Sequence, residues 1–298
     1  MASDLLELPD GRQAQVWHGG VATGPLVMFL HGTPDSRLTA LTGDAAAVRA
    51  GVHLVAVNRP GYGRSGPAES GLASVADDTV AVADSLAVHR FAVLGASGGG
   101  PYALACAARH PDRVSAVGAV ACPGVVPELD PPRLHEDPED ERDARVRELL
   151  EVGDVGAAVV ELSAAIRGYR EEMLDDDDAR VVDRWSAEMH PDDVEVVRSL
   201  PVAELAAGVR ESLASPVGYI RDVVAFLGDW EVRPEGVRSP TWLWYGTDDR
   251  NAAPRHGTWL AQRVPGSTLV VREQTAHMGA LLLHWDEMLA TLRDATDD

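Results

Sequence analysis

Short apolar runs alternate along most of the chain with segments of helical period. Six runs are rich in Val, Leu, Phe or Trp and are bounded by Gly, Pro or polar residues, at positions 25–30, 52–58, 91–95, 114–120, 241–245 and 268–271. Because consecutive positions are apolar, both faces of each run would be covered, as in the strands of a buried parallel sheet. Between the runs, apolar residues recur every three or four positions, for example over residues 74–88, which predicts helices. The alternation therefore predicts an α/β fold with a mostly parallel, doubly wound sheet.

The alternation stops between residues 123 and 237. This stretch has no convincing strand and begins with a Pro- and acid-rich segment, 123–143, while four acids at 175–178 fit a solvated turn or a helix start. Two apolar stripes of helical spacing follow: Val155, Val159, Leu162, Ile166, Tyr169 and Met173, then Val217, Ile220, Val224 and Leu227. We therefore predict a core domain of residues 1–122 and 238–298, with an all-helical cap of residues 123–237 over the carboxyl ends of the strands, where such sheets bind ligands.

Composition narrows the classes of partner. The 298 residues carry a net charge of −21, which disfavours nucleic acids and anionic membranes. All 26 basic residues are arginine, so no lysine can form a Schiff base or act as a base. No apolar run approaches the roughly 18 residues that span a membrane, and residues 1–10 lack the pattern of a signal peptide. We expect a cytoplasmic protein that acts on a small molecule.

The two cysteines, Cys106 and Cys122, are too few for a disulfide framework and lack the spacing of metal ligands. We interpret them as buried free thiols. The sequence has no cluster of His, Cys and Asp with ligand spacing and no dinucleotide-binding fingerprint. No metal and no organic cofactor are expected.

A Gly-x-Ser-x-Gly motif at residues 95–99 follows the predicted strand 91–95 and precedes a helical segment, 102–109. This strand–turn–helix setting is the one in which the motif presents a nucleophilic serine, here Ser97. A tight turn explains the glycines, and the helix start that follows leaves backbone N–H groups free for an anion. An ordinary Gly-rich turn is the weaker alternative.

A second motif, His31-Gly32-Thr33-Pro34, directly follows the strand 25–30. A serine nucleophile needs N–H donors for the oxyanion of its tetrahedral intermediate. We predict that the backbone N–H groups of Thr33 and Gly98 form this oxyanion hole. His31 is expected to bond the loop backbone and not to act in catalysis.

These two motifs, together with the intervening segment 59–65 (Arg-Pro-Gly-Tyr-Gly-Arg-Ser), resemble the α/β-hydrolase superfamily in order and approximate spacing. The resemblance covers residues 12–122 and 238–298, and the helical insertion lies where that family carries its cap. Epoxide hydrolases of the family share the His-Gly-x-Pro motif but use an aspartate nucleophile, whereas this chain has Ser97. Thr33-Pro34 replaces the Gly-rich loop of the lipase-like branch, which favours a small pocket under a cap. Proline iminopeptidases of the family carry a different motif around the nucleophile and a different loop, which disfavours peptide substrates.

The resemblance also implies the other two members of a catalytic triad. The family places its acid after the next-to-last strand, where Gly246-Thr247-Asp248-Asp249 stands, and the usual spacing selects Asp249, with Asp248 as the alternative. It places its histidine after the last strand, which selects His277; His284 would lie inside the final helix, expected at residues 280–292. The order Ser, Asp, His is the one this fold requires.

The expected activity is cleavage of a carboxylic ester or lactone. Carbon–carbon bond hydrolysis of a diketone-like substrate, a non-hydrolytic lyase or isomerase, and a ligand receptor without catalysis remain alternatives. Tyr102, Met278 and Trp185 are the first candidates for the pocket wall, and further cap residues could contribute: Tyr169, Met189, Tyr219 and Phe226.

Overall fold

The computed structural model describes residues 4–136 and 141–296. Residues 1–3, part of the N-terminal segment examined for a signal peptide, lie outside the described residues, as do 137–140 of the Pro- and acid-rich segment and 297–298.

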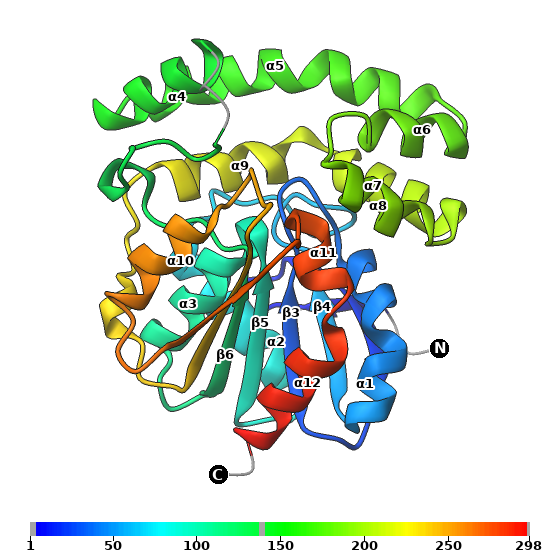
Figure 1. The fold of residues 1–298 in the computed structure, drawn as a ribbon, viewed down its shortest axis with the longest axis vertical. Helices are drawn as coiled ribbons and strands as arrows, with labels where there is room; N and C mark the ends of the chain where they lie inside the picture. The colour runs from blue at the N-terminus through cyan, green and yellow to red at the C-terminus, as the bar shows by residue number, and fades with distance from the viewer. Residues whose placement is uncertain (1–3, 137–140, 297–298) are drawn as a thin grey trace.

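The described chain forms an eight-stranded sheet in the order β1-β2-β4-β3-β5-β6-β7-β8 (Figure 1). The strands from β4 to β8 in this order run parallel, and β1 and β2 join antiparallel at one edge. The predicted α/β fold is confirmed. The bounds are β1 Leu5–Glu7, β2 Gln13–Gly20, β3 Leu26–Leu30, β4 His53–Val57, β5 Phe91–Ala96, β6 Val114–Val120, β7 Thr241–Gly246 and β8 Thr268–Arg272.

The sequence pattern missed β1 and β2, the two antiparallel strands at one end of the sheet. β2 carries Gln13, Gln15 and His18 among its residues, so it lacks the continuous apolar run of a central strand. β2 lies between β1 and β4, and its residues from Trp17 to Gly20 are only half-buried, so the strand does not need an apolar residue at every position. Antiparallel hydrogen bonds with β4 hold β2 in the sheet, in addition to the burial of its side chains.

Two apolar cores lie on the two faces of the sheet. One face is covered by α1 (Asp44–Ala50) and α12 (Trp285–Asp294), which lie side by side. The other is covered by α2 (Leu72–Ser85), α3 (Gly100–Arg109) and α10 (Pro254–Ala261). Both faces of β3 to β7 are therefore largely buried, as the apolar runs predicted, whereas β8 at the edge of the sheet is partly exposed.

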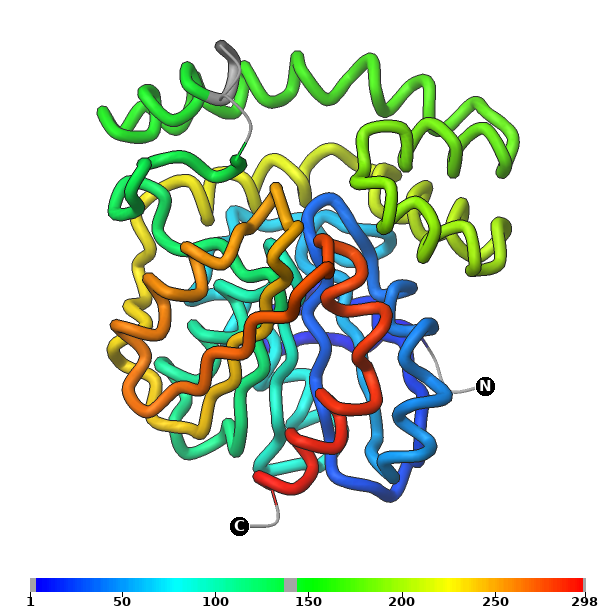
Figure 2. The backbone as a smooth tube through the Cα atoms, viewed as in Figure 1, coloured from blue at the N-terminus to red at the C-terminus, as the bar shows by residue number. Residues whose placement is uncertain are grey.

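Between β6 and β7 the chain rises into a layer of helices above the sheet and returns, as Figure 2 traces. No strand occurs in the described part of this stretch. Its helices are α4 Glu141–Glu151, α5 Val155–Asp175, α6 Asp178–Trp185, α7 Pro191–Arg198, α8 Val202–Leu213 and α9 Pro216–Leu227. Helices α5 to α8 share an apolar cluster of their own, which includes Ile166, Met173 and Val209, whereas the buried residues of α4 and α9 join the core on the sheet. Asp177 caps α6 by accepting the N–H of Arg180, so the acidic run is a helix start.

The helix expected at the C-terminal end is divided. α11 (His277–Leu282) ends before α12 begins at Trp285, and His284 lies at the break, half-buried. Short 3-10 turns complete the fold: η1 Arg37–Gly43, η2 Ser97–Gly99, η3 Val126–Glu128 and η4 Pro234–Gly236.

The order of the strands reverses beside β3. The chain moves from β3 outward to β4, then crosses back so that β5 pairs with the other side of β3. In open α/β sheets the crevice at such a switch point is where ligands bind. The loops that follow β3 and β5 are the ones that carry the two sequence motifs.

Candidate active site

Ser97 lies in the sharp turn between β5 and α3. Its φ is +49°, a left-handed conformation that non-glycine residues rarely adopt. A Cβ atom at Gly95 would collide with the carbonyl oxygen of Gly99, and one at Gly99 would collide with that of Leu30. The glycines of the motif are therefore required by close backbone approach.

The loops after β7 and β8 bring Asp249 and His277 to the same place. Nδ1 of His277 lies 2.8 Å from Oδ2 of Asp249, and Nε2 lies 3.0 Å from Oγ of Ser97. Oδ1 of Asp249 accepts the backbone N–H groups of Asn251 and Ala252, each at 2.8 Å. The structure thus brings together, in one hydrogen-bonded line, the three side chains that the sequence singled out.

The electrostatics of this line keep Asp249 ionised. Its burial, with 1% of the residue exposed, raises the pKa of the carboxyl, but His277 and the two backbone N–H groups outweigh burial, and the pKa is lowered. For His277, burial lowers the pKa, whereas the carboxylates of Asp249 and Asp193 raise it more, so the pKa lies above its ordinary value. A proton accepted at Nε2 is therefore stabilised.

The loop at residues 31–34 passes directly beside Gly98. A Cβ atom at Gly98 would lie 2.6 Å from Oγ1 of Thr33 and 2.9 Å from its Cβ. Among the described residues, none accepts a hydrogen bond from the backbone N–H of Thr33. Gly98 stands at the start of the helical segment, where the first N–H groups have no intrahelical partner. Both predicted donors are thus next to Ser97 and available to a ligand.

A cavity beside Ser97 has two lobes. The large lobe has a volume of about 240 Å³ and is lined by His277, Met278, Trp185 and Met189, among others. The small lobe has about 60 Å³ and is lined by residues that include Gly98 and Phe226. Of the candidates for the pocket wall, Met278, Trp185, Met189 and Phe226 line these lobes. Tyr169 and Tyr219 line neither lobe and pack against the apolar cluster of helices α5 to α8.

The expectation for Tyr102 is wrong. The residue is fully buried and lines neither lobe, and its hydroxyl donates to Oδ1 of Asp222 at 2.8 Å. It lies on the first turn of α3, and its ring and hydroxyl meet Arg59 and Asp222 and not the cavity. Proximity in sequence to Ser97 does not determine this direction.

Asp222 of α9 is the centre of a buried polar cluster that ties the helical layer to the loop at residues 31–34. Its Oδ2 accepts hydrogen bonds from Arg59 at 2.5 Å, from the hydroxyl of Thr33 at 2.6 Å and from that of Tyr62 at 2.7 Å. Arg59 also donates to the carbonyl oxygens of His31 and Gly32. The cluster therefore holds the strand-end loop that carries Thr33.

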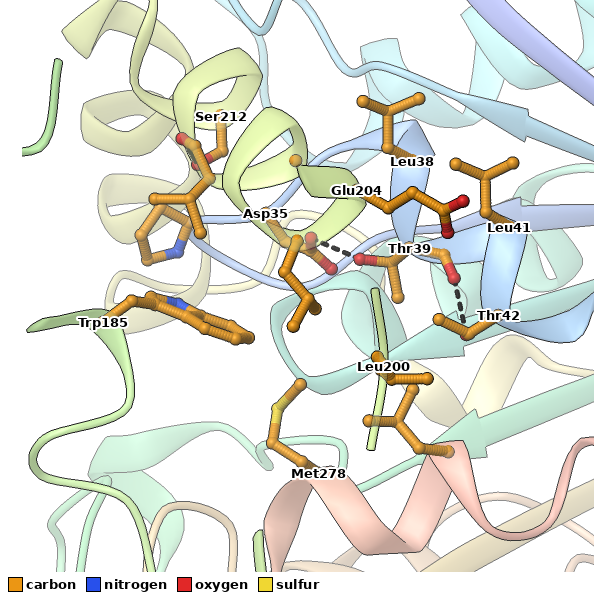
Figure 3. Close-up of a pocket in the computed structure, with 15 residues that line it drawn as sticks. Asp35, Leu38, Thr39, Leu41, Thr42, Trp185, Leu200, Glu204, Ser212 and Met278 are labelled. Atoms are coloured by element: carbon orange, nitrogen blue, oxygen red, sulfur yellow. Dashed lines mark hydrogen bonds between the residues drawn. The ribbon is translucent and has the colours of Figure 1, made fainter. Parts of the chain in front are cut away.

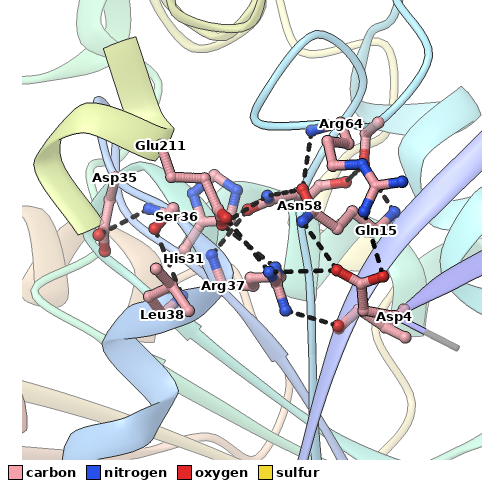
Figure 4. A network of polar contacts seen from close by, with 12 residues as sticks. Asp4, Gln15, His31, Asp35, Ser36, Arg37, Leu38, Asn58, Arg64 and Glu211 are labelled. Carbon is pink, nitrogen blue, oxygen red and sulfur yellow. Dashed lines mark hydrogen bonds and ion pairs between the residues drawn. The ribbon is translucent and has the colours of Figure 1, made fainter. Parts of the chain in front are cut away.

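Two further carboxylates connect the helical layer to the core. Oδ1 of Asp193 in α7 accepts the N–H of Gly279, two residues after His277, at 2.9 Å. Glu211 of α8 receives hydrogen bonds from Arg37 and Asn58 (Figure 4). Helices α7, α8 and α9 are thus each anchored next to a loop of the site.

The alternative residues take other roles. Asp248 does not contact His277; its Oδ1 accepts the hydroxyl of Thr247. His31 lies in the loop, with Nδ1 2.8 Å from the carbonyl oxygen of Gly32 and Nε2 accepting the N–H of Arg59. His31 is fully buried, and its contacts agree with the expected structural role.

Sequence reasoning missed Asp222 and Asp193. Asp222 stands in α9 between apolar neighbours, in a segment reading Ile-Arg-Asp-Val-Val-Ala-Phe-Leu. A single acidic residue in such an apolar helix is a sequence signal for a buried carboxylate, and a buried charge requires a partner. Asp193 lies in an acidic first turn, where a carboxylate is ordinary, and offered no such signal.

Across residues 4–136 and 141–296, no group of three or more His, Cys, Asp or Glu side chains is arranged to hold a metal ion. Within the same ranges, no helix has the length and apolar content needed to cross a membrane. Cys106 and Cys122 are buried and unpaired with one another, and burial raises the pKa of Cys106 to about 12.

Comparisons with solved structures find the same fold over the whole chain. An α/β-hydrolase fold protein from Nakamurella multipartita is 24% identical, covering 98% of each chain, with a TM-score of 0.66. The enol-lactonase from Burkholderia xenovorans is 19% identical, covering 99% of this chain and all of its own, with a TM-score of 0.66. An esterase from Exiguobacterium antarcticum is 20% identical over 99% of both chains, with a TM-score of 0.65.

Among curated proteins, epoxide hydrolase B from Mycobacterium tuberculosis is 36% identical over 104 residues, which are 34% of this chain and 29% of that protein. An epoxide hydrolase from Caballeronia sordidicola is 33% identical over 106 residues, 34% of this chain and 32% of that protein. The match thus spans about a third of these relatives. The family model of the α/β-hydrolase fold matches residues 25–282. The chain therefore belongs to the α/β-hydrolase fold family.

Proposed function

We propose that the protein is a serine hydrolase that cleaves small to medium carboxylic esters or lactones through an acyl-enzyme, with Ser97, His277 and Asp249 as its catalytic triad. The observation that carries the proposal is the line from the Ser97 hydroxyl through both ring nitrogens of His277 to the buried carboxylate of Asp249, with contacts of 3.0 and 2.8 Å. Nucleophile, base and orienting acid within hydrogen-bond reach are what serine acylation needs.

In the first half of the reaction, Oγ of Ser97 attacks the carbonyl carbon while Nε2 of His277 accepts its proton. Negative charge develops on the carbonyl oxygen, and the N–H groups of Thr33 and Gly98 donate to it. The charge of Asp249 stabilises the imidazolium. When the intermediate collapses, His277 returns the proton to the leaving alkoxide, which departs as an alcohol.

In the second half, a water molecule takes the place of the alcohol. His277 removes its proton as the oxygen attacks the acyl-enzyme, and the same two N–H groups bind the oxyanion. Collapse of this intermediate releases the carboxylic acid and restores the hydroxyl of Ser97. For a lactone, the alcohol and the acid leave as one molecule.

Epoxide opening, the activity named for the curated relatives, is disfavoured by the hydroxyl nucleophile. Attack of Ser97 on an epoxide carbon would form an ether. An ether has no carbonyl group for water to attack, so the enzyme would remain alkylated. An ester intermediate, by contrast, is hydrolysed by the same machinery that forms it.

A fluorophosphonate probe tests whether Ser97 is activated. The purified full chain is labelled, digested and mapped by mass spectrometry, and turnover of p-nitrophenyl acetate is measured in parallel. A single adduct on Ser97 is expected, absent in Ser97→Ala and strongly reduced in His277→Ala. Ser199→Ala, which removes an exposed hydroxyl of the helical layer, is the matched control and should label like the wild type.

Absence of both the adduct and turnover in folded protein would contradict the proposal and favour a receptor. An adduct on Ser97 without hydrolysis of any ester would instead indicate carbon–carbon cleavage or a lyase with the same triad. Product analysis with a diketone-like substrate separates those two.

A further inference from the structure

The two lobes of the cavity meet at Ser97 and differ in size. Both are lined by Thr33, Ser97, His135 and Asn251, so a bound carbonyl group would lie where they join. The large lobe has a volume of about 240 Å³ and the small lobe about 60 Å³. An ester bound at Ser97 has two substituents, and the two lobes offer them unequal space.

His277 determines which substituent enters which lobe. It lines the large lobe but not the small one, in which Gly98, Pro123 and Phe226 stand instead. On the proposed mechanism, His277 must deliver a proton to the leaving oxygen, so the alcohol part has to lie on the side of His277. The acyl substituent is then directed into the small lobe.

The volumes set the size of each part. A water-sized atom group needs roughly 10–15 Å³ of such space, so the small lobe holds about four to six non-hydrogen atoms and the large lobe about four times as many. Phe226 closes the small lobe: its ring lies 3.5 Å from where a Cβ atom on Gly98 would be. The small lobe therefore fits acyl groups of about two to four carbons and no longer ones.

The large lobe continues into a side groove of about 50 Å³ between α8 and η1, with which it shares Pro34, Asp35, Thr39, Trp185 and Met278. Figure 3 shows Trp185 and Met278 on one side of this groove and Leu38 and Leu41 on the other. Its remaining apolar residues are Leu200, Leu205, Val209 and Leu282. An apolar chain entering here would be removed from water, which favours binding by about fourfold per buried methylene group.

The charges along this path exclude an anionic alcohol. Asp35 and Glu204 are carboxylates, and no arginine lines the lobes or the side groove among the described residues. Asp35 is already bonded: it accepts the N–H groups of Gly32 and Ser36 and the hydroxyl of Thr39. The path therefore offers apolar contact and no counter-charge for a carboxylate or phosphate.

We propose that the preferred substrates are esters of a short acyl group, about two to four carbons, with a longer uncharged apolar alcohol whose chain passes Trp185 and Met278 into the side groove. This inference rests on the proposed serine hydrolase function. It adds the direction in which the ester binds: Phe226 limits the length of the acyl group, and the groove beside Gly208 of α8 receives the alcohol chain.

Two isomeric esters test the direction. Octyl acetate and methyl nonanoate have the same formula and similar hydrophobicity. The long chain is in the alcohol part of octyl acetate and in the acyl part of methyl nonanoate. Their hydrolysis by the wild-type chain is followed by release of acid at constant pH. We expect kcat/KM to be at least tenfold higher for octyl acetate. Equal values, or a preference for methyl nonanoate, would overturn the inference.

A variant in the side groove tests where the alcohol chain lies. Gly208 of α8 lines the groove, and a Cβ atom there would meet Ser36 and Leu38 at 3.8 and 3.9 Å, which are ordinary contacts. Gly208→Leu should therefore fold and narrow the groove, lowering the ratio of octyl acetate to ethyl acetate hydrolysis about tenfold. Gly168→Leu is the matched control, a helical glycine of α5 with no atom within 4 Å of its Cβ position, and should leave the ratio unchanged.

Phe226→Leu tests the small lobe in the opposite sense. Shortening the ring should raise hydrolysis of methyl hexanoate relative to methyl acetate. Ratios of two substrates on one preparation do not depend on how much of a variant is folded, so partial unfolding leaves each test decisive. An unchanged ratio in Gly208→Leu, or in Phe226→Leu, would refute the assigned lobe.

The outcomes also separate this inference from the function on which it rests. If neither ester is hydrolysed and Ser97 is not labelled by the probe, the serine hydrolase proposal fails and the inference falls with it. If Ser97 is labelled and methyl nonanoate is the better substrate, only the direction of binding is wrong.

Discussion

Replacing Asp222 by asparagine removes the negative charge that balances a buried guanidinium. The side chains of Arg59 and Asp222 are 1% and 3% exposed, and their closest contact is 2.5 Å. Asparagine has nearly the same shape, so the packing of α9 is kept, but one of the two acceptor oxygens becomes an NH2 group that faces the donors of Arg59 and of Tyr62 or Tyr102. The charge and the hydrogen bonds to that oxygen are lost together, in a position that water cannot reach to replace them.

The size of the effect follows from this burial. Removing one partner of a buried ion pair costs about 3–5 kcal/mol, because the remaining charge is left without solvent or counter-ion. A domain is stabilised by about 5–15 kcal/mol in total, so this is a large part of the free energy of unfolding. With a dependence of about 3 kcal/mol per molar urea, the unfolding midpoint should fall by about 1 M or more.

Urea unfolding followed by tryptophan fluorescence measures this shift. The matched control is Asp286→Asn, which breaks an ion pair with Arg49 at a similar distance of 2.7 Å. There the two side chains are 60% and 65% exposed, water solvates whichever charge remains, and the midpoint should not move measurably. If Asp222→Asn shifted the midpoint no more than Asp286→Asn, burial would not govern the energetics of this cluster.

Three further predictions concern the proposed chemistry. Asp249→Asn should lower kcat by about 10⁴-fold because His277 loses its orienting acid, while Asp248→Asn should keep near wild-type activity; equal effects in a p-nitrophenyl acetate assay would contradict the assignment of the acid. His277 can act as the general base only when it is neutral, and its pKa is raised above 6.5. We therefore expect kcat/KM to fall as the pH drops through a value above 6.5, and a pH profile that is flat down to pH 5.5 would contradict His277 as the base. Gly98→Ala should lower kcat by about 10²–10³-fold, since the new Cβ would displace Thr33 from the oxyanion site, and unchanged kcat with unchanged thermal unfolding would show that this hole is not used.

The sequence alone determined the architecture of the core and the place of the nucleophile. Apolar runs of four to seven residues bounded by Gly, Pro or polar residues indicate strands covered on both faces, and the six expected runs correspond to β3 to β8. The Gly-x-Ser-x-Gly motif was readable because its cause is local: only glycine tolerates the backbone contacts of a turn that holds Ser97 at a positive φ. The fold family followed from these motifs in order.

Tertiary structure decided what depends on the direction of a side chain or on residues distant in sequence. Ser97 and His277 are 180 positions apart, and only the fold brings their atoms to 3.0 Å. Asp248 and Asp249 are neighbours with the same chemistry, and the turn after β7 directs only Asp249 to His277. The sequence did not reveal β1 and β2 because antiparallel backbone pairing, without a continuous apolar run, holds these two strands in the sheet.

The direction of Tyr102 was misjudged for the same reason, and the position of Asp222 was not foreseen. Periodicity tells which residues share a helix face, but the neighbours of that face depend on how α3 and α9 pack. Tyr102 and Asp222 are 120 positions apart in the chain, and only this packing brings them into contact. A buried carboxylate is stable only where several donors converge on it, and those donors come from separate segments. Local patterns therefore specify elements and turns, whereas the convergence of charges and the shape of the cavity arise only when those elements are packed together.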